Sequence, residues 1–192
     1  MDLNAFYDAE FDQHETALAA TRSALAKPFA RLVGAATGAI QGGGELIFFG
    51  NGGSAADCQH LATELVARYI TDRRPIAAIA LTTDTSLMTA IGNDWTFDDL
   101  FGRQVEALGR PGDVAIGIST SGNSENILRG LAMAKSGGLI AAGFGGKDGG
   151  GMRDLCDPFL LVPSGITPRI QEMHTTLGHM LCGALEQELD LV

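Results

Sequence analysis

The chain has 192 residues, enough for one domain with a buried core, and its 13 Lys and Arg against 23 Asp and Glu give a formal net charge of −10. So acidic a chain lacks the basic face of a general nucleic-acid binder and is repelled by anionic lipid, so we expect neither nucleic acid nor a membrane as a partner. No apolar run approaches the ~18 residues of a membrane span, and the acidic start is unlike a signal peptide, so we expect a cytoplasmic location. Three scattered cysteines, Cys58, Cys156 and Cys182, argue against a disulfide framework.

The first 41 residues are predicted to be helical. Apolar side chains recur at three-, four- and seven-residue offsets from Phe6 to Val33, among many alanines. We expect Pro28 to divide this stretch into two helices and Gly42 to Gly44 to end it. Because the apolar stripe is longer than one small domain can cover, residues 1–41 are predicted to form an oligomerisation arm on the domain of residues 42–192.

Beyond the arm, short apolar runs alternate with helical segments. Near-continuous apolar character over four to six residues is typical of strands buried on both faces. The sequence therefore predicts an α/β fold in which helices cover both faces of a five-stranded parallel sheet. The strands are expected at 46–49, 76–81, 114–118, 139–144 and 159–162, and the helices at 54–70, 98–108, 124–136 and 168–190.

Two loops rich in Gly and Ser follow the first and third predicted strands, where open parallel sheets bind ligands. The first is Gly50-Asn51-Gly52-Gly53-Ser54, and the second runs from Ser119 to Ser124 with four hydroxyls before a helix. Hydroxyls, free amides and a helix N-terminus suit a phosphate monoester. The alternatives are a turn with a helix cap and a dinucleotide fingerprint, although no acidic residue follows at the fingerprint's usual spacing.

A second constellation combines metal-ligand and acid–base residue types. His60 and Glu64 are one helical turn apart, and Gln171 and His179 lie roughly 80° apart around the last predicted helix. Two histidines and a carboxylate suit zinc, whereas Gln is an uncommon zinc ligand. The alternatives are a surface pair for His60 and Glu64 and a core histidine for His179. His174, about 140° from His179, is not expected to share its site.

Ordered motifs over nearly the whole chain resemble the sugar isomerase (SIS) domain family, and within it the enzymes that interconvert phosphorylated heptoses. The motifs are Gly50 to Asp57, His60, Glu64, Gly92 to Asp94, Gly117 to Ser124, Gly146 to Gly150 and Arg169 to His174. The resemblance implies a flavodoxin-like αβα sandwich that forms a homotetramer, with sites between subunits and one zinc per subunit. It implies conversion of sedoheptulose 7-phosphate to D-glycero-D-manno-heptose 7-phosphate, the first step towards the ADP- or GDP-heptose precursors of lipopolysaccharide and related glycans.

The resemblance also implies roles for individual residues. Substrate would be held by Asn51, Gly52, Gly53, Glu64, Asn93, Asp94, Ser119, Thr120, Ser121, Ser124 and Gln171. The zinc ligands would be His60, Glu64, Gln171 and His179.

Aldose–ketose isomerisation needs a base over the carbon and an acid or metal at the oxygens. We expect Glu64 to move the carbon-bound proton and His179 to act at the oxygen. The alternative function is a non-catalytic SIS scaffold that binds a replication initiator protein. Retention of His60, Glu64 and His179 favours the enzyme. The glycine-rich stretch 147–151 is expected to be mobile.

Overall fold

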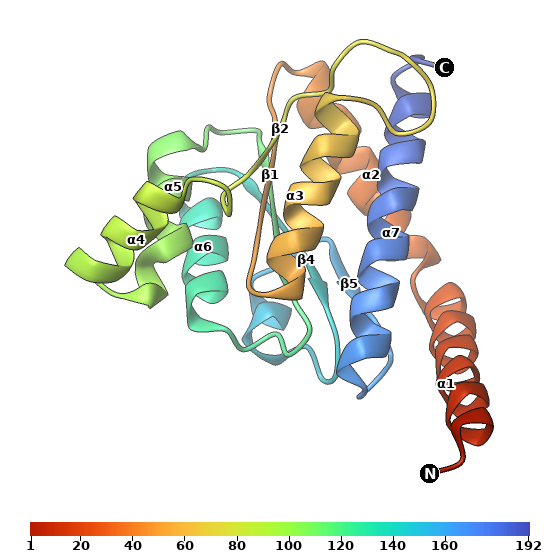
Figure 1. Cartoon of the computed structure of the whole chain (residues 1–192). Coiled ribbons are helices and arrows are strands. Elements are labelled where there is room, and N and C mark those ends of the chain that lie inside the picture. Colours follow the sequence, from red (N-terminus) through yellow and green to blue (C-terminus); the bar gives the residue numbers. More distant parts are fainter.

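The computed structural model covers residues 1–192 and has a central parallel sheet with helices on both faces (Figure 1). The strands are β1 (Leu46–Gly50), β2 (Ala78–Ala80), β3 (Val114–Ser119), β4 (Ile140–Gly145) and β5 (Phe159–Leu161). The α-helices are α1 (Leu3–Ala24), α2 (Ala26–Gln41), α3 (Gly53–Val66), α4 (Thr85–Asp94), α5 (Leu100–Leu108), α6 (Glu125–Ser136) and α7 (Thr167–Glu188). Short 3₁₀ turns span Phe97–Asp99 and Gly150–Asp154.

The strand order is β2-β1-β3-β4-β5, and every neighbouring pair is parallel. The chain therefore moves outward in one direction from β1 to β2 and in the other from β3 to β5. The carboxyl ends of β1 and β3 meet at this reversal, since Gly50 pairs with Ile118. The predicted five-stranded parallel sheet is confirmed, and its topology brings the two glycine- and serine-rich loops together at the position where such sheets bind ligands.

The sheet separates two apolar cores because successive strand side chains point to opposite faces. Phe48 of β1 packs with α2, α3 and α7, whereas Phe49 packs with α5 and α6 on the other face. All residues of β1 and β3 are buried, as expected for strands covered on both sides. The core holding α3 and α7 against one face positions the candidate site.

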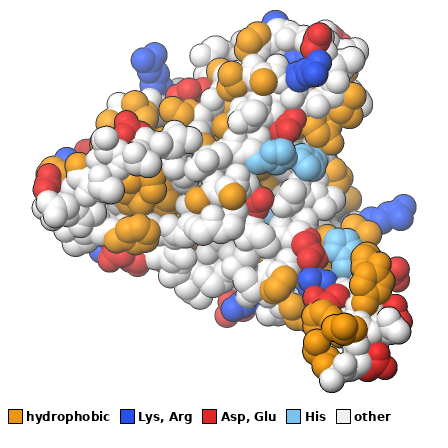
Figure 2. All heavy atoms as spheres, viewed as in Figure 1, with side chains coloured by type: hydrophobic (Ala, Val, Ile, Leu, Met, Phe, Trp, Pro, Cys, Tyr) orange, Lys and Arg blue, Asp and Glu red, His pale blue; other side chains and the backbone are white.

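The N-terminal arm is helical as predicted, but it divides at Leu25, three residues before Pro28. Pro28 instead lies in the first turn of α2, where its missing N–H costs no helical hydrogen bond. The helix α1 leaves the body beside α7 (Figure 1), and Arg169 of α7 holds it by donating to the Glu10 carbonyl at 2.6 Å. Apolar side chains gather on its protruding part (Figure 2), among them Phe6 and Phe11, each more than half exposed.

The sequence did not predict α4, which begins after Asp84. The Asp84 carboxylate accepts a hydrogen bond from the Leu87 amide at 2.9 Å and so caps the helix. No helix of the chain combines the length and apolar character that crossing a membrane requires.

Candidate active site

The site lies where α3 packs against α7, on the face of the molecule that Figure 2 shows. Gly178 of α7 faces Leu61 of α3 so closely that a Cβ at residue 178 would lie 2.5 Å from the leucine side chain. This close approach brings the flanking side chains of the two helices within contact distance. The side chains that flank this contact on α3 and α7 therefore share one surface, which we call the groove.

His60, Glu64 and His179 converge at the solvent end of this groove. The Nε2 atoms of His60 and His179 are 2.7 Å apart, and Glu64 Oε1 is 3.7 Å from His60 Nε2. The ring of Tyr69 stacks on His179 with centroids 5.6 Å apart. Because His60 is 45% exposed and Glu64 is 20% exposed, the three polar groups are open to a ligand from solvent.

A second polar cluster lies nearer the start of both helices. Gln171 donates to one oxygen of Asp57, and Thr175 donates to the other at 3.0 Å. Ser54 Oγ donates to the side-chain oxygen Oε1 of Gln171 at 3.2 Å. Burial raises the pKa of Asp57 above its ordinary value, although both hydrogen bonds favour the ionised form. Gln171 thus shares the groove, but its amide contacts Asp57 and Ser54, and its role as a metal ligand stays a prediction.

The donor set at the solvent end has the chemistry that zinc prefers, two imidazoles and a carboxylate. As they lie, the hydrogen-bonded Nε2 atoms are closer than the about 3.3 Å that separates two nitrogens on a tetrahedral zinc. No group of three His, Cys, Asp or Glu side chains has the arrangement of a formed metal site. Zinc fits this set after the two imidazoles separate by roughly 0.6 Å.

The loop between β3 and α6 keeps its hydroxyls available for a ligand. Ser119 Oγ accepts from the Gly122 amide at 3.1 Å, and Ser121 Oγ accepts from the Asn123 amide at 3.2 Å. The two hydroxyl oxygens also lie 3.4 Å apart, so one hydroxyl donates to the other and one proton remains free for a ligand. Ser124 occupies the N-cap position of α6, yet its side chain makes no capping hydrogen bond. The geometry consequently favours the anion cradle over a turn that serves only to cap the helix.

The two glycine- and serine-rich loops are joined by a reciprocal pair of side-chain amides. Asn51 donates to Asn126 at 2.8 Å, and Asn126 donates back at 2.9 Å. Asn126 is buried in the first turn of α6, while Asn51 follows β1 directly. Because the pair engages both the amide nitrogen and the oxygen of Asn51, it fixes the first loop relative to the second.

The stretch 147–151, expected to be mobile, is packed against the loop from Ser119 to Ser124. A Cβ at Gly122, where φ is +69°, would lie 2.1 Å from the Gly149 carbonyl oxygen. The Gly151 amide donates to the Asn123 side chain at 3.1 Å, and the Met152 amide donates to the Gly122 carbonyl at 3.2 Å. The glycines thus permit close contact between two backbones.

Asn93 and Asp94 lie apart from the groove. They end α4, which packs on α5 and the turn at Phe97–Asp99, and their side chains are exposed. The hydrogen bond of the Asn93 side chain goes to Asp94, at 2.8 Å. Their predicted contact with substrate stays a prediction.

His174 and His179 occupy different environments, as their spacing predicted. His174 is fully buried against the sheet, 3.0 Å from the Gly145 carbonyl oxygen, and burial lowers its pKa to about 4. It is the core histidine of the helix, with Nε2 bonded to Gly145 and Nδ1 without a hydrogen-bond partner, whereas His179 faces the groove.

Three contributors received no role from the sequence: Asp57, Tyr69 and Asn126. Asp57 lies seven residues before Glu64, two helical turns on one face, and that spacing was a usable signal. The local sequence around Tyr69 or Asn126 contains no signal for their contacts, because each contacts a residue more than 70 positions away.

Comparison with known proteins identifies relatives over almost the full length. A family model described as SIS domain matches residues 11–146. A phosphoheptose isomerase of Paramagnetospirillum magneticum is 56% identical over 186 residues, 97% of each chain. The solved phosphoheptose isomerase of Francisella tularensis superposes with a TM-score of 0.94 at 33% identity, over 97% of this chain and 100% of that one. That of Neisseria gonorrhoeae gives 0.91 at 39% identity, over 96% and 99%. Similarity at this level over nearly the whole chain shows that it belongs to the phosphoheptose isomerases of the SIS domain family.

Proposed function

We propose that the chain isomerises sedoheptulose 7-phosphate to D-glycero-D-manno-heptose 7-phosphate. The observation that carries the proposal is the convergence of the Glu64 carboxylate with the imidazoles of His60 and His179 in an open groove. A carboxylate beside paired imidazoles offers a base and an acid within one site, which a proton shift between adjacent carbons requires.

The loop from Ser119 to Ser124 is assigned to the substrate phosphate. The one unshared hydroxyl proton of the Ser119–Ser121 pair and the N-terminus of α6 would stabilise a dianion without any lysine. Asn51, Gly52 and Gly53 approach from the neighbouring strand end and are assigned to the sugar. Gly53 leaves room there, since a Cβ at this residue would lie 3.3 Å from the Gln171 side-chain oxygen.

In the proposed reaction, the Glu64 carboxylate takes the proton from C1 of the open-chain ketose. The electron pair of the broken C–H bond forms the C1–C2 double bond, and the C2 carbonyl oxygen accepts a proton from His179. The resulting enediol then returns its O1 proton to the deprotonated His179 as C1 becomes the aldehyde. Glu64 returns its proton to C2, so no proton or electron is gained or lost overall.

Zinc is proposed to be held by His60, Glu64 and His179, with Gln171 as the fourth group, one ion per subunit. When bound, it would supply Lewis acidity at the substrate oxygens. Glu64 then has two competing duties, because a carboxylate bound to a cation is a weaker base. Every Glu64 variant therefore needs a metal assay beside its rate measurement.

A homotetramer with sites shared between subunits is part of the same proposal. The exposed apolar face of α1 supports association, and the position of Asn93 and Asp94 away from the groove supports a contribution from a neighbouring copy. The whole proposal is tested by incubating the purified protein with sedoheptulose 7-phosphate and following the aldose product by NMR. Absence of both isomerisation and proton exchange would favour the non-catalytic scaffold instead.

A further inference from the structure

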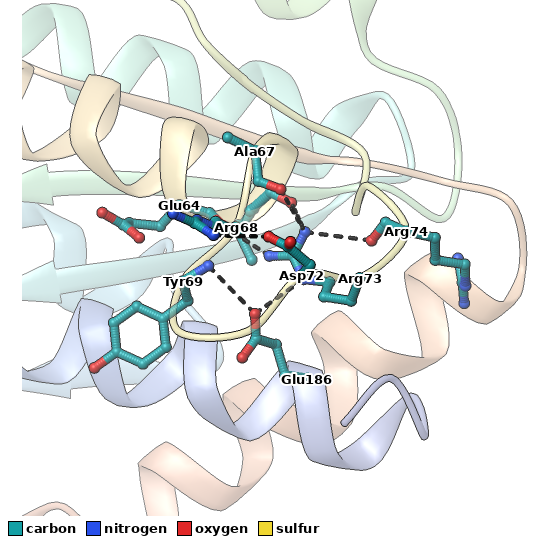
Figure 3. Close-up of polar contacts among 9 residues, drawn as sticks. Glu64, Ala67, Arg68, Tyr69, Asp72, Arg73, Arg74 and Glu186 are labelled. Carbon is teal, nitrogen blue, oxygen red and sulfur yellow. Dashed lines mark hydrogen bonds and ion pairs between the residues drawn. The ribbon is translucent and has the colours of Figure 1, made fainter.

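The most deeply buried ion pair of the molecule lies directly behind the groove and joins its two helices (Figure 3). Arg73 comes from the segment between α3 and β2, and Glu186 comes from the last turn of α7. Arg73 Nε donates to Glu186 Oε1 at 2.9 Å, and the two side chains are 1% and 3% exposed.

On the α3 side, the guanidinium closes the C-terminus of the helix that carries Glu64. Nη2 donates to the Glu64 carbonyl at 2.7 Å, and Nη1 donates to the Leu65 carbonyl at 2.7 Å. The last carbonyls of a helix have no partner within it, and a cation there is favoured by the helix dipole. The backbone turn that presents the Glu64 carboxylate is therefore held by one rigid planar group.

On the α7 side, Glu186 follows His179 by two helical turns and lies on the same face. The oxygen that accepts from Arg73 also accepts from the Tyr69 amide at 3.3 Å. Tyr69 in turn stacks its ring on His179, with the ring planes 29° apart. One carboxylate thus fixes both the guanidinium behind Glu64 and the residue that lies on His179.

The net stability supplied by such a pair does not explain its presence, because a buried ion pair commonly contributes no more than apolar side chains of similar volume. The tight contact of Leu61 with Gly178 already joins α3 and α7. The ion pair in addition fixes the position of the C-terminal end of α3 relative to the face of α7 that carries Glu186 and His179.

We propose that Arg73, acting through Glu186, is a positioning residue that sets Glu64 against His179 for proton transfer, an inference that rests on the proposed function. Neither side chain touches substrate in this scheme. Their removal is therefore expected to alter the chemical step and to leave the binding of the phosphate end unchanged.

The decisive variant is the double substitution Arg73→Met, Glu186→Met, which replaces the pair with apolar groups and leaves no buried charge unpaired. We expect kcat for sedoheptulose 7-phosphate to fall about 10- to 100-fold, because small misplacements of reacting groups have effects of this size. KM is expected to stay within about twofold. Arg73→Lys keeps the charge but not the planar fork, so its kcat should lie between those of the wild type and the double variant.

The matched control is Arg74→Met, because Arg74 is the exposed neighbour and offers only its backbone carbonyl to Arg73. It should retain the wild-type kcat and KM. Circular dichroism and active-site titration report the folded, competent fraction of each variant. A folded double variant with wild-type kcat overturns the proposal, and so does a loss of kcat that merely equals the loss of competent protein.

A crystal structure of the double variant provides a readout independent of turnover. Positioning predicts that residues 64–69 shift relative to α7 while the loops after β1 and β3 stay in place. An unchanged backbone at 64–69 overturns the inference even if activity falls. A wild-type protein that fails to turn over sedoheptulose 7-phosphate defeats the proposed function instead, and the crystal structure of the double variant still tests the positioning role of the Arg73–Glu186 pair.

Discussion

Glu64 is the residue on which the proposed chemistry depends most directly. Glu64→Gln keeps the size of the side chain but removes its basicity, so turnover is expected to fall by about 10²–10⁴-fold, the usual contribution of a positioned acid or base. Substrate binding should survive, because the phosphate is assigned to a different loop. Solvent deuterium should also cease to enter the sugar at the carbon next to the carbonyl.

The control for this variant is Glu188→Gln, an exposed carboxylate near the end of α7 that should leave the rate unchanged. Zinc content is measured alongside by atomic absorption, since loss of metal would mimic loss of the base. A Glu64→Gln protein that retains its metal and the wild-type rate would show that a group other than Glu64 transfers the carbon-bound proton.

His174 supplies a prediction about stability and pH. Burial lowers its pKa from 6.5 to about 4 in the folded chain, so between these values the unfolded chain binds a proton that the folded chain does not. The free energy of unfolding should therefore fall as the pH drops from about 6.5 to 4, by up to ~1.4 kcal/mol per pH unit. The contribution is fully present above pH 6.5.

Urea denaturation at pH 7, 6 and 5 and at constant protein concentration measures this dependence. His174→Gln can still donate to the Gly145 carbonyl but does not titrate, so its unfolding free energy should fall less steeply over the same range. Equal slopes for the two proteins would assign the acid sensitivity to other groups.

At the scale of single residues, helical spacing placed His60 and Glu64 on one face of a helix, and the resemblance to the SIS family joined His179 to them. Neither was sufficient for Tyr69 or Asn126, because their partners come from distant segments that only the folded sheet brings close. For Gln171, the sequence predicted a position near His179 on the last helix, but it did not predict the contacts with Asp57 and Ser54.

Among the elements, the loop between β3 and α6 carries the prediction about phosphate binding. The double substitution Ser119→Ala, Ser121→Ala removes two hydroxyls that bond to each other and accept from two loop amides, and with them the one proton that is free for a ligand. Substrate affinity should weaken by roughly 1 kcal/mol or more per lost charge-assisted hydrogen bond. Isothermal titration calorimetry with sedoheptulose 7-phosphate measures the change.

The comparison variant is Ser136→Ala, whose hydroxyl donates to the Met133 carbonyl at the far end of α6 and should not affect affinity. Unchanged affinity in a folded Ser119→Ala, Ser121→Ala protein would show that this loop does not bind the substrate phosphate.

The strands and most helices could be predicted because each has a continuous apolar run or a clear helical period. The helix α4 was missed because its ten residues bury only Ile91, which leaves little periodicity to detect. The break near residue 25 was misplaced because a proline is tolerated in the first turn of a helix as readily as before it.

For the whole molecule, the exposed face of α1 predicts assembly. Phe6 and Phe11 are 53% and 54% exposed on a helix that protrudes from the body, and a second copy would bury them. Light scattering at micromolar concentration should give about 80 kDa, the mass of four 20.0 kDa chains. Phe6→Asp together with Phe11→Asp should shift the protein to a smaller species, whereas a wild-type mass of 20 kDa would contradict the tetramer.

The fold class was predictable at this scale because alternating strands and helices have few ways to pack. The predicted contact of Asn93 and Asp94 with substrate stays a prediction, since within one chain these residues lie away from the groove. Reasoning from one sequence places residues within a domain, but it does not say which surfaces of two copies meet.

The contact between Gly122 and Gly149 limits how far the sequence can vary. Surface loops usually accept replacements and insertions with little effect. Here a Cβ at residue 122 would lie 2.1 Å from the Gly149 carbonyl oxygen, and one at residue 150 would lie 2.3 Å from the Asn123 side chain, so these two loop positions have the mutational sensitivity of the protein interior. In a library of single substitutions and one-residue insertions selected for isomerase activity, these loop positions should be depleted as strongly as Phe48 and Phe49 of the core. Residues 70–72, which are exposed, should vary freely.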